Sequence, residues 1–266
     1  MFRTQARAVP PGSQGASLDW VSYFNLNTME PPLPWNDSYR LAPAERARVA
    51  PSIQQFQLGE NSEGRHLLCR AREFADAHGD PQFAEAVALF IQEEQRHSRM
   101  LGRYLNLQDV PSLERHWVDT VFRHVRVLAG LELCMRVLAT AEVIAVPYYT
   151  ALSKATASPL LAKICANILT DEAAHLQFQS FVFTLLAKGR TPRLQRAVEA
   201  WHDAFLQSTL AIVWIEHGAV LRAGGYAFAS FRTESRQILR GLSCIPQPAP
   251  RPRRTRLAQA PPFQGV

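Results

Sequence analysis

Two stretches of this sequence decide its fold: residues 90–101, which read FIQEEQRHSRML, and residues 168–179, which read ILTDEAAHLQFQ. Each places a glutamate three residues before a histidine, Glu94 before His97 and Glu172 before His175. On an α-helix this spacing turns both side chains to one face, about one turn apart. The neighbouring positions on that face are apolar, and an acid and an imidazole are costly to bury there unless they are paired or bind a metal. The two stretches therefore predict two buried helices that share a polar centre.

The composition predicts a globular protein with a neutral body. The chain has 266 residues, of which 47% are hydrophobic, which is enough for a large core. The six arginines in residues 1–17 and 246–266 equal the whole net charge of +6, so nucleic-acid binding is not expected. The four cysteines lack Cys-x-x-Cys spacing and are expected to stay reduced in the cytoplasm. We expect no secretory signal and no membrane span, because the most apolar stretch, residues 204–220, contains Glu216 and His217.

The periodicity of the apolar residues predicts one all-α domain over residues 18–245, between disordered tails at residues 1–17 and 246–266. A segment with Trp20, Tyr23, Phe24 and Trp35 is expected to lie over the core as an irregular strap, because its prolines forbid a long helix. Glycine and proline positions bound long helices predicted over residues 43–78, 81–105, 113–153 (kinked at Pro147), 158–187 and 191–223, before a short amphipathic segment over 228–242. The sequence shows no strand pattern, short-period repeat or glycine-rich phosphate loop.

The Glu-x-x-His spacing occurs four times, and the surroundings separate the four pairs. Glu63 and His66 lie among polar residues and are expected on a solvent-facing helix surface. Glu199 and His202 also have polar neighbours and are expected at the surface or behind a metal ligand. The pairs at residues 94–97 and 172–175 lie on apolar faces, where two buried ion pairs would be an alternative explanation. Two such pairs on two faces favour a metal, and carboxylate with neutral imidazole suits iron or manganese.

A site for two metal ions needs carboxylates from two further helices. Glu142 lies about as far before the turn near residue 156 as Glu172 lies after it, so antiparallel packing brings the two level. Glu132 is roughly 15 Å lower on the same predicted helix and is expected to be a buried or interface acid. On the first predicted helix, Glu60 is centred on the apolar stripe. The distance along the helix from the turn at Gly79 slightly favours Glu63 instead. We take Glu60 as the ligand, and Glu63 stays open as the alternative.

The resulting pattern, Glu60, Glu94 with His97, Glu142, and Glu172 with His175, resembles that of the ferritin-like carboxylate-bridged di-iron or di-manganese proteins. The resemblance covers roughly residues 50–187. The run Leu58-Gly59-Glu60 is also similar to the first ligand helix of rubrerythrins and demethoxyubiquinone hydroxylases. Ile168 stands where arylamine N-oxygenases carry an additional histidine, and the cysteine pairs of an electron-relaying rubrerythrin are missing from the sequence. The resemblance implies a ferritin-like four-helix bundle, to which this chain adds a fifth long helix and the N-terminal strap.

By this resemblance, the six residues bind two iron ions, with manganese or a mixed pair as alternatives, and form the catalytic centre. Members of the superfamily activate dioxygen or peroxide, or oxidise ferrous iron. We expect an oxidase or oxygenase that uses dioxygen on a small organic substrate, with an external electron donor as a further partner. A ferroxidase or iron-handling protein is the alternative, and a metal-free structural bundle is a third. The strap, the fifth helix and the basic tail favour the first of these classes.

The sequence also yields expectations for the surroundings of the site. Asp171 and Gln179 are candidates to support the ligands, with a solvent-facing Asp171 as the alternative, and Tyr148 and Tyr149 are expected to be packing residues. The fifth long helix is expected to be covered on several sides, either by the bundle or by a partner chain in a homodimer. An apolar substrate cavity would lie between that helix, residues 147–149 and the second helix. His217 is expected to be a satisfied buried histidine, with a substrate anchor as the alternative.

Overall fold

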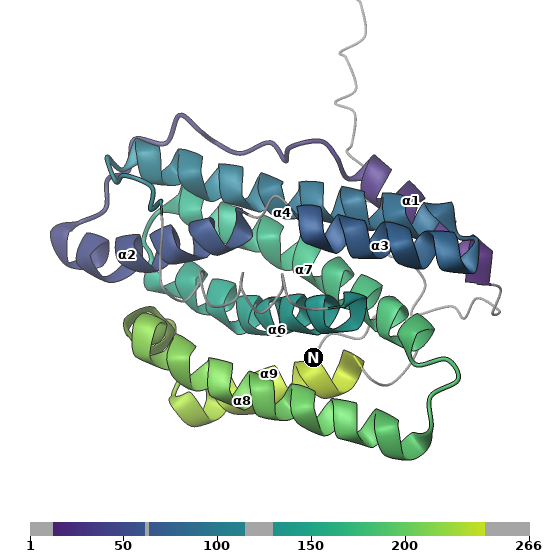
Figure 1. Ribbon diagram of the computed structural model, residues 1–266. Helices are drawn as coiled ribbons and strands as arrows, with labels where there is room; N and C mark the ends of the chain where they lie inside the picture. Colours follow the sequence, from purple (N-terminus) through teal and green to yellow (C-terminus); the bar gives the residue numbers. More distant parts are fainter. Residues whose placement is uncertain (1–12, 62–63, 115–129, 243–266) are drawn as a thin grey trace, which may run out of the picture.

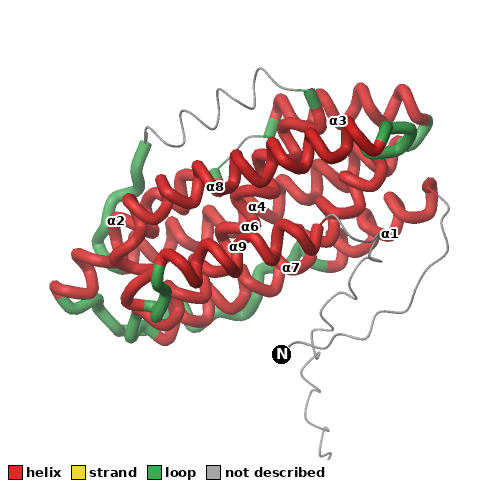
Figure 2. Tube along the Cα trace, turned by 90° about the horizontal axis from the view of Figure 1, so that it is seen from below, coloured by secondary structure: helices red, strands yellow, loops and turns green. Residues whose placement is uncertain are grey.

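The computed structural model describes residues 13–61, 64–114 and 130–242, and this part of the chain consists of helices and loops without a strand (Figures 1 and 2). In chain order the helices are α1 (Ser13–Leu26), α2 (Pro43–Glu60), α3 (Arg65–His78), α4 (Pro81–Leu107), α6 (Leu131–Ala155), α7 (Pro159–Leu186), α8 (Pro192–Ala223) and α9 (Phe228–Leu242). The all-α prediction is confirmed for these residues.

The helices bury their apolar faces by packing side by side around one centre. Helices α2 and α3 lie end to end along α4 (Figure 1), and α4 also contacts α7. Helix α6 packs along α7 and closes the ring through contacts with α2 and α3. Helix α1 covers α4 from outside, whereas α8 and α9 cover α6. The centre is therefore enclosed by helices on every side of the ring, with a second layer on two sides.

The prediction of one helix over residues 43–78 is wrong, because the helix is interrupted between α2 and α3. Asn61 is not helical, and Gly64 adopts the left-handed conformation with φ +62° just before α3. A Cβ atom at Gly64 would lie 2.5 Å from the Ile91 side chain on α4, so the backbone approaches α4 closely there. Only glycine fits both conditions. The break makes Glu60 the last residue of α2 instead of an interior residue of a longer helix.

The N-terminal segment differs from the predicted disordered tail and irregular strap. Helix α1 begins at Ser13, inside the expected tail, and the Ser17 hydroxyl donates to Asp80 at 2.7 Å. Trp20 and Phe24 are buried in ring contact with Phe178 on α7, at centroid distances of 5.3 and 5.4 Å. The prolines of this segment all follow Met29, whereas α1 ends at Leu26, so they do not interrupt the helix. The segment does lie over the core as expected, but it does so as a helix.

The third predicted helix is not continuous over residues 113–153. Residues 111–114 and Gly130 are not helical, and α6 begins at Leu131, while residues 115–129 lie outside the described residues. Helix α6 continues through Pro147 to Ala155, and the kink at Pro147 stays a prediction. The other helices match the predicted bounds within two residues, with Ser158 and Thr191 capping α7 and α8 through their side chains. The predicted tail at residues 246–266 lies outside the described residues.

The apolar core is divided into two parts by a polar layer. One part contains Phe83, Phe90 and Phe178, and the other contains Ile53, Leu101 and Ile168. On α4 the boundary falls over residues 93–98, and on α7 it falls over residues 171–172, where the buried side chains are polar or charged. Residues 90–101 of α4 and 168–179 of α7 therefore cross the middle of the bundle at one level.

Candidate metal centre

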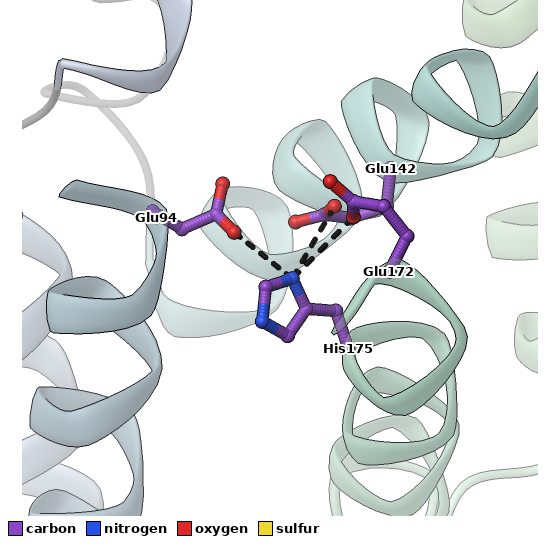
Figure 3. A group of neighbouring side chains, drawn as sticks. All are labelled: Glu94, Glu142, Glu172 and His175. Carbon is purple, nitrogen blue, oxygen red and sulfur yellow. Dashed lines mark ion pairs between the residues drawn. The ribbon is translucent and has the colours of Figure 1, made fainter. Parts of the chain in front are cut away.

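All six predicted ligands meet in the polar layer. Glu60 comes from the end of α2, and Glu142 comes from α6, while α4 and α7 each supply one Glu-x-x-His pair. Ligand atoms of Glu94, Glu142, Glu172 and His175 all lie within 4.8 Å of one another (Figure 3). Ligand atoms of Glu60, Glu94 and His97 form a second such group. Because Glu94 belongs to both groups, it lies between them.

The Nδ1 atoms of both imidazoles face carboxylates. His175 Nδ1 lies 2.9 Å from Glu94 Oε1, 3.4 Å from Glu172 Oε2 and 3.7 Å from Glu142 Oε2. His97 Nδ1 lies 3.7 Å from Glu172 Oε1 and 3.8 Å from Glu94 Oε1. Both imidazoles thus approach the same two carboxylates, Glu94 on α4 and Glu172 on α7.

These atoms are buried but lack hydrogen bonds. His97, His175 and Glu172 have 0% exposed surface, and Glu142 has 3%. Nevertheless Nδ1 of both histidines, Glu94 Oε1 and both Glu172 oxygens make no hydrogen bond of good geometry, even where His175 and Glu94 approach at 2.9 Å. Buried polar atoms without partners are rare because each costs roughly 1–3 kcal/mol. Five such atoms that face one another indicate a site for a cation.

The opposite nitrogens of the two histidines are held in a crossed arrangement. His97 Nε2–H donates to Asp171 on α7 at 3.2 Å, and His175 Nε2–H donates to Glu93 on α4 at 3.0 Å. With the proton on Nε2, the Nδ1 lone pair of each ring points to the centre, which is the form that binds a metal. Asp171 contacts a predicted ligand as its supporting role requires, and its solvent-facing alternative is wrong, since Asp171 is buried. Glu93 was missed, although the acid-Glu-x-x-His pattern is repeated in both stretches.

An arginine and an asparagine close this side of the site. Arg96 Nη2 lies 2.5 Å from Glu93 Oε1 and 3.1 Å from Asp171 Oδ2, so one guanidinium forms an ion pair with each supporting acid. Asn27, just after α1, donates to Glu93 and to Asp171, and its carbonyl accepts from Arg96. The hydrogen bond from His97 and the charge of Arg96 hold the pKa of Asp171 well below its usual value despite its burial. Helix α1 thereby fixes the network that orients both imidazoles.

The central carboxylates cannot all carry their charge without a cation. Burial, followed by repulsion from Glu94, raises the pKa of Glu60, and burial with repulsion from Glu142 raises that of Glu172. The carboxylates facing His175 raise its pKa although burial opposes this. His175 and His97 in turn lower the pKa of Glu94 to about 2, against the effect of its burial. In the absence of metal, protons therefore occupy the place of the missing positive charge.

The donor set fits a metal. Four carboxylates and two imidazoles are oxygen and nitrogen ligands that iron and manganese prefer. A metal would supply the charge that the acids lack and would take up the orphaned Nδ1 and oxygen atoms. The buried Glu and His cluster can therefore hold a metal ion.

Further hydroxyl and amide groups contact the ligands from α6 and α7. Tyr149 Oη donates to Glu60 Oε1 at 2.8 Å, and Gln179 Nε2 donates to Glu142 Oε1 at 3.4 Å. Gln179 thus supports a ligand as predicted, and Tyr149 is more than the packing residue we expected. Beside them, Ser52 Oγ lies 2.8 Å from both Tyr148 Oη and His217 Nδ1. His217 is therefore a satisfied buried histidine, as expected.

Aromatic rings pack around Tyr148, beside residues 147–149. Phe56 stacks on Tyr148 with centroids 3.4 Å apart, and the His217 ring lies 4.9 Å from Phe56. The apolar cavity expected between α8, residues 147–149 and α4 stays a prediction.

The remaining candidates lie away from the centre. Glu132 is half-buried and paired with Arg136 and Arg190, away from the centre as expected. His202 is buried between Arg136 and Thr140, at 3.1 Å from each, so its expected surface or supporting position is wrong. Its helix neighbours suggested a polar surface, but the turn that carries it faces α6. His66 is half-buried, and Glu63 lies outside the described residues.

Comparisons of this chain with protein-family models, with curated proteins and with solved structures found no match. The assignment of the centre therefore depends on the geometry described above.

Proposed function

We propose that this protein is a ferritin-like, dinuclear metal oxidase or oxygenase that uses dioxygen to oxidise a small organic substrate. Two groups of ligand atoms that share Glu94 support a pair of ions, with one imidazole for each. The single observation that carries the proposal is the set of five orphaned, fully buried ligand atoms facing one centre. Two ferrous ions bound there would supply two electrons to dioxygen, and an external electron donor would restore them.

The chain's own residues orient the ligands and exclude water. The crossed hydrogen bonds from the two histidines to Asp171 and Glu93 fix both imidazole rings, and Arg96 forms ion pairs with both of these acids. Phe24 and Phe90 lie against the His175 ring, at 6.3 and 4.8 Å between centroids, and keep that side dry. Tyr149 holds a proton at its hydroxyl next to Glu60, where it limits the ways in which that carboxylate can turn.

The α2 end of the site is its most accessible side. Glu60 and Glu94 are partly exposed, whereas the other four ligands are buried. The described neighbours on this side include Phe56, Ile91 and Tyr149, and the two supporting acids are on the opposite, α1 side, paired with Arg96. An aromatic and aliphatic approach suits an organic substrate better than hydrated ferrous iron, which needs acidic residues along its path. This supports the oxygenase over the ferroxidase.

Iron titration under controlled oxygen tests the proposal. The metal-free protein is loaded anaerobically with ferrous iron and should bind about two ions per chain; oxygen is then admitted and iron oxidation is followed by absorbance. An oxygenase should oxidise about two ferrous ions per chain and stop until a chemical reductant is added. Continued turnover of a fifty-fold excess of ferrous iron would replace our proposal with the ferroxidase. Binding of no iron or manganese would refute both.

His202→Ala is the matched control for His97→Ala in this titration. Each substitution removes a buried histidine that follows a glutamate by three residues, but only His97 has an orphaned nitrogen at the centre. We expect His97→Ala to bind about one ion fewer and His202→Ala to bind as many as the native chain.

A further inference from the structure

The outward face of α8 is uncharged over most of its length. Helix α8 buries one side, with Leu206, Leu210 and Val213, against α6 and α9 (Figure 1). The opposite side leaves large apolar side chains in solvent: Leu194 is 54% exposed, Trp201 41% and Ile215 79%. The other positions between them on this face are Ala197, Ala204, Phe205, Ser208, Ala211, Ile212 and Ala219. A solvent-facing side of a helix ordinarily carries charges, so this face is made to be covered.

The spacing of these residues identifies what covers the face. Leu194, Trp201, Ser208 and Ile215 recur every seven residues, and Ala197, Ala204 and Ala211 recur every seven residues beside them. These are the two seam positions of a helix pair. When a second α8 is laid antiparallel on the first, each alanine of one seam position meets a residue of the other seam position. The partner is large at the outer levels and small at the central one. The levels are Ala197 with Ile215, Trp201 with Ala211, and Ala204 with Ser208, and each occurs twice about the twofold axis.

We propose that the outward face of α8 binds the same face of a second copy of this chain, as an antiparallel helix pair. A twofold interface requires one surface that complements itself, and the large-against-small pattern provides this. Two acids at the edge of the face are bonded within the chain: Asp203 pairs with Arg236 at 2.9 Å, and Glu216 accepts from Gln55 at 3.4 Å, while the exposed Arg193 lies at one end of the face. A partner of opposite charge would have little to bind, whereas an apolar copy of the same face is suited to it.

The size of the face predicts a weak dimer. From Leu194 to Ala219 it is about 39 Å long and about 10 Å wide, so two copies bury on the order of 800 Å² through α8. Specific interfaces need about 1,000 Å² or more, so this face alone is smaller than that of a tight dimer. We expect dissociation constants on the order of micromolar.

The helix α8 also has the length and apolarity to cross a membrane, with a mean hydropathy of 1.3 over its most apolar window. Its inner side is packed against α6 and α9, so only one face is available to lipid. A membrane surface is therefore the alternative partner of that face, and the experiment must test it.

Sedimentation velocity of the full-length protein between roughly 1 and 100 µM should show a shift from 29.9 kDa to twice that mass. Ile215→Glu should weaken the dimer at least tenfold, because it would bury an unpaired carboxylate. Leu26→Glu is the matched control, since Leu26 is 65% exposed on α1 and outside this face. A monomer at all concentrations, or equal effects of the two substitutions, would refute the proposal. So would a monomer that floats with phosphatidylcholine and phosphatidylglycerol vesicles.

Disulfide trapping tests the antiparallel register without a disruptive charge. In a chain with Cys69→Ser and Cys244→Ser, mild oxidation should link two copies of the double variant Ala197→Cys with Ile215→Cys. Ile215→Cys alone should stay unlinked, because antiparallel pairing puts the two copies of residue 215 roughly 27 Å apart along the axis. Linking of the single variant would show a parallel pair, and failure of the double variant to link would refute the register.

Discussion

Helix α6 contributes acids to two polar clusters that differ in how the charge of their carboxylates is balanced. We call them the carboxylate cluster, made by Glu60, Glu94, His97, Glu142, Glu172 and His175, and the arginine cluster, made by Glu132, Arg136, Thr140, Arg190 and His202. Both contain glutamate and buried histidine. In the arginine cluster, two guanidinium groups neutralise one carboxylate, and neither nitrogen of His202 lacks a partner.

The state of the histidines shows the difference. Arg136 donates to His202 Nδ1, and Nε2–H donates to Thr140, so burial and the charge of Arg136 lower the pKa of His202 to about 4. His175 instead has its Nδ1 among three carboxylates without a hydrogen bond of good geometry, and its pKa is raised. A satisfied network is complete within the chain, whereas the carboxylate cluster is complete only with a cation. Orphaned ligand atoms, rather than the presence of Glu and His, therefore distinguish a metal site from a structural network.

The largest expected effect is on metal-linked stability. Adding manganese(II) to the metal-free protein at about a thousand times the dissociation constant should stabilise it by about 4 kcal/mol per site, which corresponds to roughly 10 °C in the melting temperature. His175→Ala should remove most of this shift, as measured by differential scanning calorimetry with and without the metal. If His202→Ala removed the shift as well, the distinction between the two clusters would be wrong.

Amide substitutions should act in opposite directions on the two clusters. Glu132→Gln leaves Arg136 and Arg190 without their carboxylate and should cost about 1–2 kcal/mol, since the side chain of Glu132 is 27% exposed and partly screened. Glu172→Gln relieves the repulsion from Glu142 and should leave the metal-free protein as stable or more so. Urea unfolding of metal-free protein measures both. Metal content should show the reverse ranking, with a loss of about one ion for Glu172→Gln only.

The pH dependence of the metal-free protein should reflect the protons that the carboxylate cluster binds when no metal is present. The folded pKa values of Glu60 and Glu172 are raised above 4.5 and that of His175 above 6.5, so the folded state holds protons that the unfolded state releases. Stability should rise as the pH falls toward 6.5, by about 1.4 kcal/mol per pH unit for each extra proton. Below 6.5, His202 has the opposite sign, because only the unfolded chain protonates it until about pH 4.

Metal should reverse this dependence. In the loaded protein the ion occupies the place of those protons, so acid releases the metal and lowers stability. Chemical unfolding at several pH values, with and without manganese, compares the two. Parallel pH profiles would show that the cluster does not exchange protons for metal.

The smallest expected effect comes from the hydroxyl behind Glu60. Tyr149→Phe should keep the fold and the number of metal ions, but it should weaken metal binding by about tenfold, as is usual when a ligand loses its supporting hydrogen bond. Tyr148→Phe is the control, because its hydroxyl bonds Ser52 and not a ligand. Isothermal titration with manganese measures both. Equal affinities for the two variants would limit Tyr149 to packing.

The sequence by itself determined the all-α class and five residues of the carboxylate cluster, and it favoured Glu60 as the sixth while leaving Glu63 open. This was possible because a helix converts the spacing of three between Glu and His into one shared face, and because apolar neighbours show which face is buried. Equal distances from one turn were enough to select Glu142 over Glu132, since antiparallel helices rise at the same rate per residue. These are local or nearly local relations, which a single chain carries in its pattern.

Only the tertiary structure decided which buried groups are satisfied. The partner of His175 Nε2 is Glu93 on another helix, and the network depends on Asn27, which follows α1 in a segment that we expected to be irregular. The break before α3 arises from the close approach of Gly64 to Ile91, and His202 is buried because α6 lies against its turn of α8. Hydrogen bonds and close approaches between distant segments depend on side-chain positions in space, which periodicity along the chain does not specify.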